Sequence, residues 1–166
     1  MNFDVVKQIV EYARSKEEEY HKNFRFTITT NGMLLDDDTI DYINKEMYNV
    51  VLSIDGRKEV NDRMRVRVDG SGCYDRILPK FKKLVDGRGD KEYYVRGTYT
   101  KYNLDFSEDV MHLYEAGFDE ISVEPVIESP EEAYAITEED LDQIYAEYDK
   151  LVDRIGAIRK NGKHIN

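Results

Sequence analysis

Apolar and polar positions alternate along the chain in two periods, one typical of helices and one typical of strands. Residues 3–20 carry apolar side chains at helical spacing, which predicts that the chain opens with an amphipathic helix. Short segments with the period of a strand follow it, and helical spacing recurs between them. The expected strands are Phe24–Asn31, Asn49–Asp55, Tyr93–Thr100 and Ile121–Val126.

Local signals place the helices between these strands. Asp36 and Asp37 are good N-caps, and Thr137 and Asp140 have the spacing of a capping box. The segment between Gly56 and the third helix is expected to be a loop. The expected helices after the first lie near Asp37–Lys45, Asp75–Val85 and Phe106–Ala116, and the last begins at Thr137.

Strands separated by helices predict a parallel sheet with right-handed crossovers. One face of this sheet is apolar and the other is polar, and the polar groups cluster at the carboxyl ends, where parallel α/β folds place their sites. A polar lining predicts a wide, incompletely closed barrel around a wet cavity, because a closed barrel fills its lumen with apolar residues. We therefore expect an α/β fold, a partial TIM-like (β/α) barrel segment with about four parallel strands. Its polar face would lie open or be covered by a partner or a further segment, and it consists of Thr27, Thr29, Asn31, Val51, Ser53, Asp55, Arg96, Thr98, Thr100, Ser122 and Glu124.

Composition narrows the class of protein. With 166 residues, 40% of them hydrophobic and 36% charged, the chain is expected to form a single globular domain. It has no apolar run that could span a bilayer and no signal peptide, so we expect a cytoplasmic protein without a membrane partner. The net charge of −11 argues against binding nucleic acid. Because Cys73 is the only cysteine, we expect no intramolecular disulfide and no metal cluster held by this chain.

Basic residues gather once in this acidic chain. Five of them fall within the eleven positions from Arg57 to Arg67. Such a segment can receive an anion, or it is simply a solvated loop, and the sequence leaves both readings open. The residues are Arg57, Lys58, Arg63, Arg65 and Arg67.

Short motifs lie on or directly after the expected strands in a fixed order. They are Thr30-Asn31-Gly32, Ser53-Ile54-Asp55-Gly56, Asn61-Asp62-x-x-Arg65 with Gly70-Ser71-Gly72-Cys73-Tyr74-Asp75, Arg96-Gly97-Thr98-x-Thr100-x-x-Asn103 and Ile121-Ser122-Val123-Glu124-Pro125-Val126. Their order and spacing resemble the radical S-adenosylmethionine (SAM) enzymes of the peptide-maturase branch, which includes the sulfatase maturases and the thioether-forming maturases of cysteine-rich peptides. The resemblance covers nearly the whole chain, and its last two motifs look most like the thioether maturases.

The resemblance implies a piece of a larger enzyme. The family's CxxxCxxC loop for its 4Fe–4S cluster, its GGEP segment and its auxiliary-cluster cysteines have no counterpart here. We therefore expect residues 1–166 to be a single-domain fragment of the barrel, without the cluster-binding first β/α units and the C-terminal extension.

The expected function follows from this resemblance. The full-length parent would use S-adenosylmethionine and a 4Fe–4S cluster to abstract hydrogen from a peptide, forming a thioether or a related oxidation product. The chain alone would be inactive, because cleavage of the cofactor needs an electron from the cluster. Neither group is expected to be found bound to this chain, and its residual affinity for S-adenosylmethionine would be poor, about 1 mM. The alternative is a stand-alone, non-catalytic binding or regulatory module. We also expect self-association, because an open sheet has unpaired edges.

Several residues acquire candidate cofactor roles through the resemblance. Ser53 and Arg65 match a serine and an arginine that look like cofactor contacts in the family. The alternatives are a strand-end cap for Ser53 and an ion pair with Asp55 or Asp62 for Arg65. Asn31 is a further candidate cofactor contact, or only a turn residue.

The polar face of the last two strands supplies the remaining candidates. Arg96 is expected to bind cofactor or substrate peptide, or to pair with Glu124, because an arginine there needs a partner or a wet cavity. Thr98 and Glu124 are candidate substrate contacts. For Glu124, a proton acceptor or a structural partner are the alternatives. Cys73, beside a helix start, is expected to serve in a cap rather than as a nucleophile.

Overall fold

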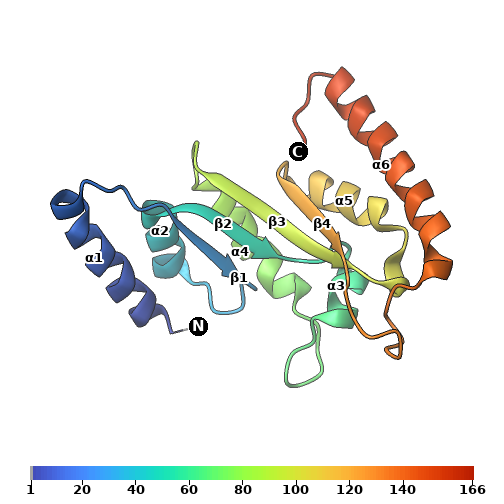
Figure 1. The fold of residues 1–166 in the computed structure, drawn as a ribbon, viewed down its shortest axis with the longest axis horizontal. Helices are drawn as coiled ribbons and strands as arrows, with labels where there is room; N and C mark the ends of the chain where they lie inside the picture. Colours follow the sequence, from blue (N-terminus) through green and yellow to red (C-terminus); the bar gives the residue numbers. More distant parts are fainter. Residues whose placement is uncertain (1) are drawn as a thin grey trace. The chain divides into compact units, whose positions relative to one another are not determined.

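The structure, a computed structural model, describes residues 2–166. Its strands form one sheet in the order β1-β2-β3-β4, so that neighbours along the chain are also neighbours in the sheet. β1 pairs with β2 and β3 with β4 in parallel, and helices alternate with the strands (Figure 1). The expected α/β barrel segment, an open sheet of four parallel strands, is confirmed.

Contacts within the chain divide it into two compact units. The first holds Met1–Leu52 and Arg76–Tyr93, and the second holds Ser53–Asp75 and Tyr94–Asn166. The expectation of a single domain over residues 1–166 stays a prediction.

The first unit packs helices against two strands. Its apolar core forms because the apolar side chains on one face of the strands meet the apolar stripes of the helices. Asp36 caps a helix as predicted, since its Oδ1 accepts a hydrogen bond from the backbone N of Thr39 at 2.9 Å. The elements are α1 (Phe3–Tyr20), β1 (Phe26–Thr30), α2 (Asp37–Glu46), β2 (Met47–Ser53) and α4 (Tyr74–Asp86), the last two shared with the second unit. Buried core residues include Ile28, Ile40, Ile43, Val50, Leu52, Ile77, Phe81 and Leu84.

A buried arginine in the first unit bonds to backbone carbonyls at the starts of two strands. Arg88 donates hydrogen bonds to the carbonyls of Met47, Tyr48 and Glu92, the residues at which two neighbouring strands begin. Burial lowers the pKa of Arg88, and no carboxylate within residues 2–166 pairs with it. The guanidinium therefore serves as a multiple donor to backbone carbonyls.

In the second unit, one helix packs against a strand of the sheet and a longer helix packs against that helix. A cluster of Tyr99, Leu104, Phe106 and Ile144 forms its core, and the rings of Tyr99 and Phe106 stack with centroids 4.2 Å apart. The predicted capping box is confirmed. The Thr137 side chain accepts a hydrogen bond from the backbone N of Asp140, and the Asp140 side chain accepts one from the backbone N of Thr137. The elements are α3 (Lys58–Met64), β3 (Glu92–Tyr99, from Tyr94), the 3-10 turn η1 (Lys101–Asn103), α5 (Phe106–Glu115), β4 (Ile121–Pro125), η2 (Glu138–Asp140) and α6 (Leu141–Lys160).

The expectation of a loop between Gly56 and the third helix was wrong in part. Helix α3 occupies Lys58–Met64 in this segment. It is short, and five of its seven residues are charged or polar, so it has no apolar stripe by which periodicity could reveal it.

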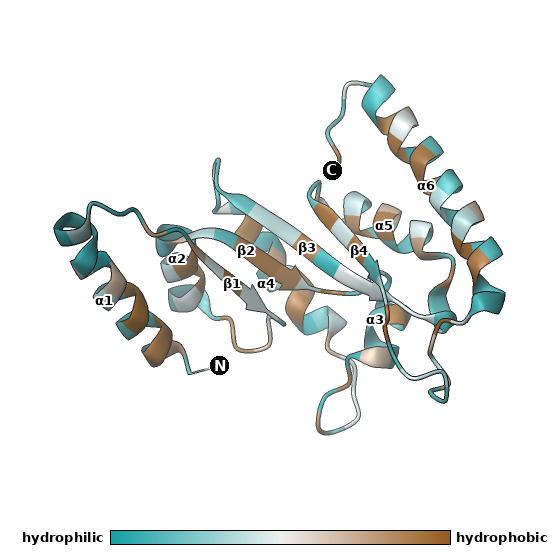
Figure 2. Ribbon diagram, viewed as in Figure 1, coloured by the Kyte–Doolittle hydropathy of each residue, from teal (hydrophilic) through white to brown (hydrophobic). Residues whose placement is uncertain are grey.

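The two faces of the sheet differ in burial as predicted. Along β3, Tyr93, Val95 and Tyr99 are buried while Arg96 is exposed. In Figure 2, which is coloured by hydropathy, this strand carries both a brown, hydrophobic band and a teal, hydrophilic band. Two residues of the expected polar face, Asp55 and Thr100, are instead buried. Both can be buried because their side chains are fully engaged in hydrogen bonds to neighbouring backbone and side-chain groups.

Helices of sufficient length and apolarity to cross a membrane do not occur among residues 2–166.

Candidate functional site

Directly after the carboxyl end of β2, the buried Asp55 forms an ion pair with Arg65. Asp55, only 4% exposed, accepts hydrogen bonds from Nε and Nη2 of Arg65 at 2.7 and 2.8 Å. Its Oδ1 also accepts from the backbone N of Thr98 at 3.0 Å. The two parallel bonds fix the plane of the guanidinium, so of the two ion pairs considered for Arg65, the one with Asp55 forms.

The ion pair leaves part of Arg65 available. Its Nη1 makes no hydrogen bond to any residue between 2 and 166, and the side chain remains 30% exposed. A guanidinium has five N–H donors in one plane, so one edge can hold Asp55 while another faces a second anion.

A chain of polar side chains fixes the loop that carries Arg65. Asn61, fully buried, accepts from the backbone N of Asp55 at 3.3 Å and donates to Asp62 Oδ1 at 3.0 Å. Asp62 Oδ1 in turn accepts from the backbone N atoms of Cys73 and Tyr74, each at 2.8 Å. The Asn61-Asp62 pair therefore ties the end of β2 to the start of α4.

Cys73 belongs to this chain of contacts. Its thiol is buried and lies 3.4 Å from Asn61 Nδ2. A Cβ at the preceding residue, Gly72, would stand 2.0 Å from Asp62 Cγ, so glycine is needed for the carboxylate to reach the backbone N of Cys73. The capping carboxylate comes from Asp62 in the preceding helix, α3, and Cys73 contributes its backbone N.

Asp109 on α5 anchors the turn after β2, and sequence reasoning missed it. It is fully buried, and its Oδ1 accepts from Arg57 at the backbone N (2.9 Å) and at Nε (2.8 Å). These hydrogen bonds, with one from Arg57 to Asp105, raise the pKa of Arg57. Gly56 has φ +128°, and a Cβ there would lie 2.3 Å from Asp109 Cβ, so this turn requires glycine.

Ser53 ends β2 and is half-buried. Its hydroxyl makes no hydrogen bond within residues 2–166, so the alternative role as a strand-end cap is not formed. The hydroxyl remains free to donate to or accept from a ligand.

Arg96, Thr98 and Glu124 lie on the polar face of β3 and β4. The strand register places Thr98 opposite Glu124 and Arg96 opposite Ser122. Arg96 Nη2 forms an ion pair with Glu124 Oε1, and both side chains are 49% exposed. The pairing considered for these two residues is thus present, on a solvent-exposed part of the second unit.

Asn31 lies in the first unit, in the turn after β1. Its side chain is exposed, and Oδ1 accepts from the backbone N of Met33 at 3.3 Å, a turn-forming contact. Gly32 follows with φ +75°, where a Cβ would lie 2.5 Å from Phe81 Cε1. The other candidates, Ser53, Arg65, Arg96, Thr98 and Glu124, belong to the second unit, and the ligand roles of all six stay predictions.

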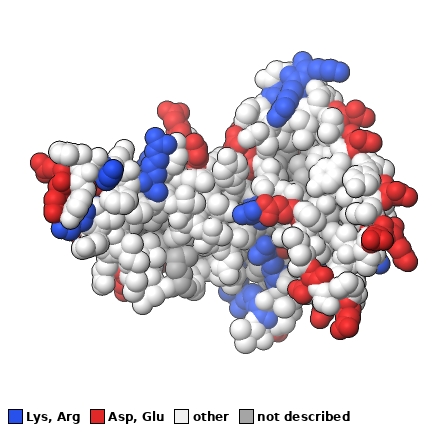
Figure 3. Space-filling view, viewed as in Figure 1, with Lys and Arg blue, Asp and Glu red and all other residues white. Residues whose placement is uncertain are grey.

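The basic segment from Arg57 to Arg67 is mostly neutralised by carboxylates of the second unit. Arg57 pairs with Asp105 and Asp109, Lys58 with Asp75, Arg65 with Asp55 and Arg67 with Asp69. Arg63 instead stacks on the ring of Tyr102. Figure 3 shows basic side chains over α3 and the loop that follows it, and acidic side chains along α6.

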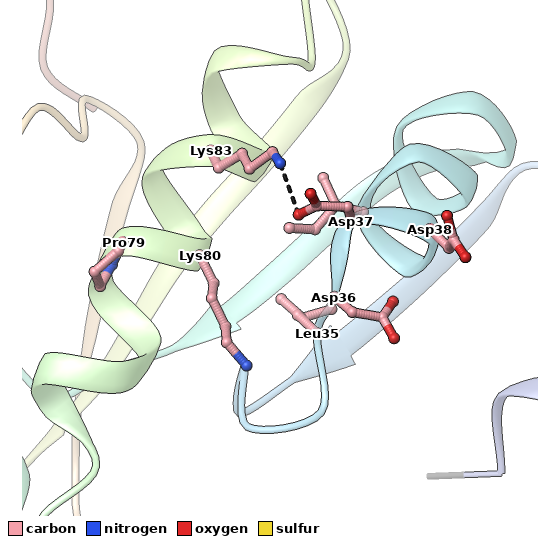
Figure 4. A pocket seen from close by; sticks show the side chains of 8 residues that line it. Leu35, Asp36, Asp37, Asp38, Pro79, Lys80 and Lys83 are labelled. Carbon is pink, nitrogen blue, oxygen red and sulfur yellow. Dashed lines mark ion pairs between the residues drawn. The ribbon is translucent and has the colours of Figure 1, made fainter.

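A hollow of about 550 Å³ in the first unit is lined by charged residues, most of which are engaged in contacts within the chain. It is lined by the start of α2 and one side of α4 (Figure 4). Asp36 caps α2, Lys83 Nζ pairs with Asp37 Oδ1 at 2.6 Å, and Lys80 Nζ donates to the carbonyl of Met33 at 3.0 Å. Of these contacts, the exposed Lys83–Asp37 pair joins α2 to α4, and Lys80 joins α4 to the loop before α2.

Within residues 2–166, no three histidine, cysteine or acidic side chains are grouped so that they could hold a metal ion.

Comparison with known proteins finds relatives of this chain in sequence and in fold. No protein-family model matches the chain. A cysteine-type anaerobic sulfatase-maturating enzyme of Clostridium novyi (strain NT) is 24% identical over 84 residues, which are 51% of this chain and 22% of that protein.

Solved structures extend the likeness to the whole chain. Native anSMEcpe with bound AdoMet and Kp18Cys peptide has a TM-score of 0.85 and 17% identity, and the match covers 99% of this chain and 46% of that one. A domain of pyruvate-formate lyase-activating enzyme from Bacteroides vulgatus ATCC 8482 has a TM-score of 0.54 and 11% identity over 87% of this chain and 86% of that one.

The chain thus spans less than half the length of the sulfatase-maturating enzymes that it matches. Over that span the resemblance predicted from the motifs is confirmed: the chain resembles the radical SAM peptide maturases and has the fold of their sulfatase-maturating branch.

Proposed function

We propose that residues 1–166 are the central barrel segment of a cytoplasmic radical SAM enzyme that modifies a peptide, by thioether formation or a related oxidation. The observation that carries the proposal is the Asp55–Arg65 pair directly after β2, the strand that ends at Ser53 with its unbonded hydroxyl, in a fold whose relatives hold AdoMet. Asp55 is buried and holds Arg65 through two hydrogen bonds, so the pair is not a simple solvated charge, yet it leaves donors of Arg65 unused.

The donor chemistry of these two residues fits the carboxylate of S-adenosylmethionine. Arg65 would receive it through Nη1, while Asp55 holds the opposite edge of the guanidinium, and Ser53 would donate its hydroxyl to the same carboxylate or to a ribose oxygen. Bound together with a 4Fe–4S cluster, S-adenosylmethionine supplies the radical that abstracts a hydrogen atom from the peptide. Residues 2–166 do not fit the cluster, because Cys73 is buried against Asn61 and is not grouped with two further histidine, cysteine or acidic side chains that could hold a metal ion.

The substrate peptide would lie along the polar face of β3 and β4. Arg96 and Glu124 pair with each other but are half exposed, and Thr98 is half-buried beside them. An extended peptide carries both donors and acceptors, which match an exposed ion pair and a hydroxyl. The relative with a bound Kp18Cys peptide supports a peptide as the substrate class.

Titration of the chain with S-adenosylmethionine tests the proposal. We expect saturable amide shifts in NMR spectra around Ser53 and Arg65, with a dissociation constant of about 1 mM because the cluster that chelates the cofactor is missing. Arg65→Ala should weaken binding by roughly 1.5–3 kcal/mol, the range for charge-assisted hydrogen bonds.

Arg67→Ala is the matched control, since Arg67 lies in the same loop but pairs with Asp69 and Ser71. It should leave the affinity for S-adenosylmethionine unchanged. Wild-type affinity in the Arg65→Ala protein, or shifts confined to other parts of the chain, would remove the assignment.

A further inference from the structure

Helix α3 and the turn η1 enclose a cavity that the proposed cofactor contacts do not use. Its volume is about 290 Å³. α3 follows β2 and η1 follows β3, so the cavity lies beyond the carboxyl ends of two parallel strands, where α/β folds bind ligands. It is lined by Val60, Arg63 and Met64 of α3 and by Thr100, Tyr102 and Asn103 of the η1 turn.

Arg63 is the cation of this cavity, and it has no anionic partner. The other basic residues between Arg57 and Arg67 each pair with a carboxylate. Arg63 forms no ion pair and no side-chain hydrogen bond with any residue between 2 and 166. Its guanidinium carbon lies instead 3.4 Å from the centroid of the Tyr102 ring.

Stacking prepares Arg63 to bind a carboxylate. A guanidinium that lies flat on an aromatic ring keeps its N–H donors at its edges, pointing away from the ring. The ring also restricts the rotamers of the arginine, which lowers the entropy lost when a ligand binds. A carboxylate can then form two parallel hydrogen bonds with one edge.

The remaining polar groups of the cavity narrow the class of ligand. Thr100 and Asn103 are already hydrogen-bonded to each other, and Asn103 Nδ2 donates to Asp109. Glu59 also lines the cavity and does not pair with Arg63. A ligand that offers a carboxylate to Arg63 and an N–H to Glu59 matches both charges, and an acidic residue within a peptide carries both groups.

We propose that the Arg63–Tyr102 cavity binds the side-chain carboxylate of an acidic residue in a peptide. The proposal rests on the proposed function in one respect, namely that the ligand of this end of the sheet is a peptide. Arg63 supplies the charge, Tyr102 orients it, and the apolar walls from Val60 and Met64 accommodate the methylene groups of the acidic side chain.

Two short peptides distinguish this site from general attraction to basic residues. The probes are acetyl-Gly-Glu-Gly-amide and acetyl-Gly-Gln-Gly-amide, titrated into the full 166-residue chain and followed by amide shifts. We expect the glutamate peptide to give saturable shifts in α3 and η1 and to bind at least about fivefold more tightly than the glutamine peptide, from the loss of a charge-assisted bidentate contact.

Three variants and one control variant locate the effect. Arg63→Gln and Tyr102→Leu should each lower the affinity for the glutamate peptide by roughly fivefold or more. The first removes the charge, and the second removes the ring on which the guanidinium stacks. Arg63→Lys keeps the charge without the planar fork and should fall between wild type and Arg63→Gln. Arg67→Gln removes a charge from the same loop and should bind as wild type does. The spectra themselves report whether each variant is folded.

Equal binding of the two peptides, no saturable shift, or an equal effect of Arg67→Gln and Arg63→Gln would overturn the proposal. The outcome is separable from that of the proposed function. If S-adenosylmethionine binds at Arg65 and the glutamate peptide does not bind at Arg63, only the subsite is lost. If the glutamate peptide binds and S-adenosylmethionine does not, the cofactor assignment is lost and the carboxylate site stands.

Discussion

At the scale of single residues, Asp55 determines how Arg65 can act. The buried carboxylate neutralises the charge of Arg65, but it holds only the Nε–Nη2 edge and leaves Nη1 unbonded within residues 2–166. The same carboxylate accepts a hydrogen bond from the backbone N of Thr98, so that Arg65 is oriented relative to β3. Asp55 thus positions the residue that we assign to the cofactor.

The cost of removing this carboxylate can be measured. Asp55→Asn should lower the free energy of unfolding by about 2 kcal/mol, because it replaces a buried bidentate acceptor by a group that cannot accept both N–H donors of Arg65. Urea unfolding followed by circular dichroism gives the value. Asp69→Asn in the exposed pair with Arg67 is the control and should change it by less than about 0.5 kcal/mol. Similar losses in both variants would show that the Asp55–Arg65 pair is an ordinary surface contact.

Arg88 offers a second test at this scale. Arg88→Lys should destabilise the chain by about 2 kcal/mol, since one ammonium cannot reach the carbonyls of Met47, Tyr48 and Glu92 together. Thermal or urea unfolding measures the change. An Arg88→Lys protein as stable as wild type would contradict the multiple-donor role of the guanidinium.

At the scale of elements, α5 and α6 are joined by charged side chains as well as by their aromatic core. Glu108 of α5 accepts from Arg154 Nη1 at 2.9 Å and from Lys150 Nζ at 2.8 Å, both on α6. The hydrogen bond from Arg154, followed by that from Lys150, lowers the pKa of Glu108 from its ordinary value of 4.5 to about 2. The ionised form of Glu108 is therefore stabilised in the folded chain relative to the unfolded one.

This shift has a defined pH window. Because the folded pKa is lowered, the stabilisation is fully present above about pH 4.5 and is lost as the pH falls towards about 2. Glu108→Gln should reduce the free energy of unfolding at pH 7 by about 0.5 kcal/mol, a small value because the side chain is 38% exposed. Its difference from wild type should shrink to zero on acidification. A difference that does not depend on pH would assign the effect to packing rather than charge.

The elements also show what the sequence could and could not determine. Strand faces were predictable because residues such as Val95 and Tyr99 repeat with period two and must be buried together. Helix α3 was not, because a short polar helix leaves no periodic signal. For Arg65, both Asp55 and Asp62 were within reach along the chain. Only the structure shows that Asp62 is already used at the start of α4.

At the scale of the whole molecule, the sheet leaves an edge that can pair with a further strand. β1 is the outer strand of the order β1-β2-β3-β4, and an apolar cavity of about 340 Å³ lies between α1 and β1 in the first unit. Unpaired backbone N–H and C=O groups of an edge strand favour pairing with another chain. We propose that the chain self-associates.

Light scattering at high micromolar concentration tests this proposal. We expect a mass of two or more chains, and a shift towards monomer in Thr29→Lys, which places a charge on the exposed edge strand. Lys22→Glu, outside the strand, is the control and should not change the mass. A monomeric mass for wild type would contradict self-association.

The central claim is that the free edge of Arg65 receives the carboxylate of S-adenosylmethionine. The most direct measurement compares S-adenosylmethionine with its decarboxylated analogue in NMR titrations of wild type and Arg65→Ala. The account predicts that wild type binds S-adenosylmethionine at least about tenfold more tightly than the analogue, and that Arg65→Ala binds both equally weakly. If the preference for the carboxylate persists without Arg65, another group receives it and the central claim is contradicted.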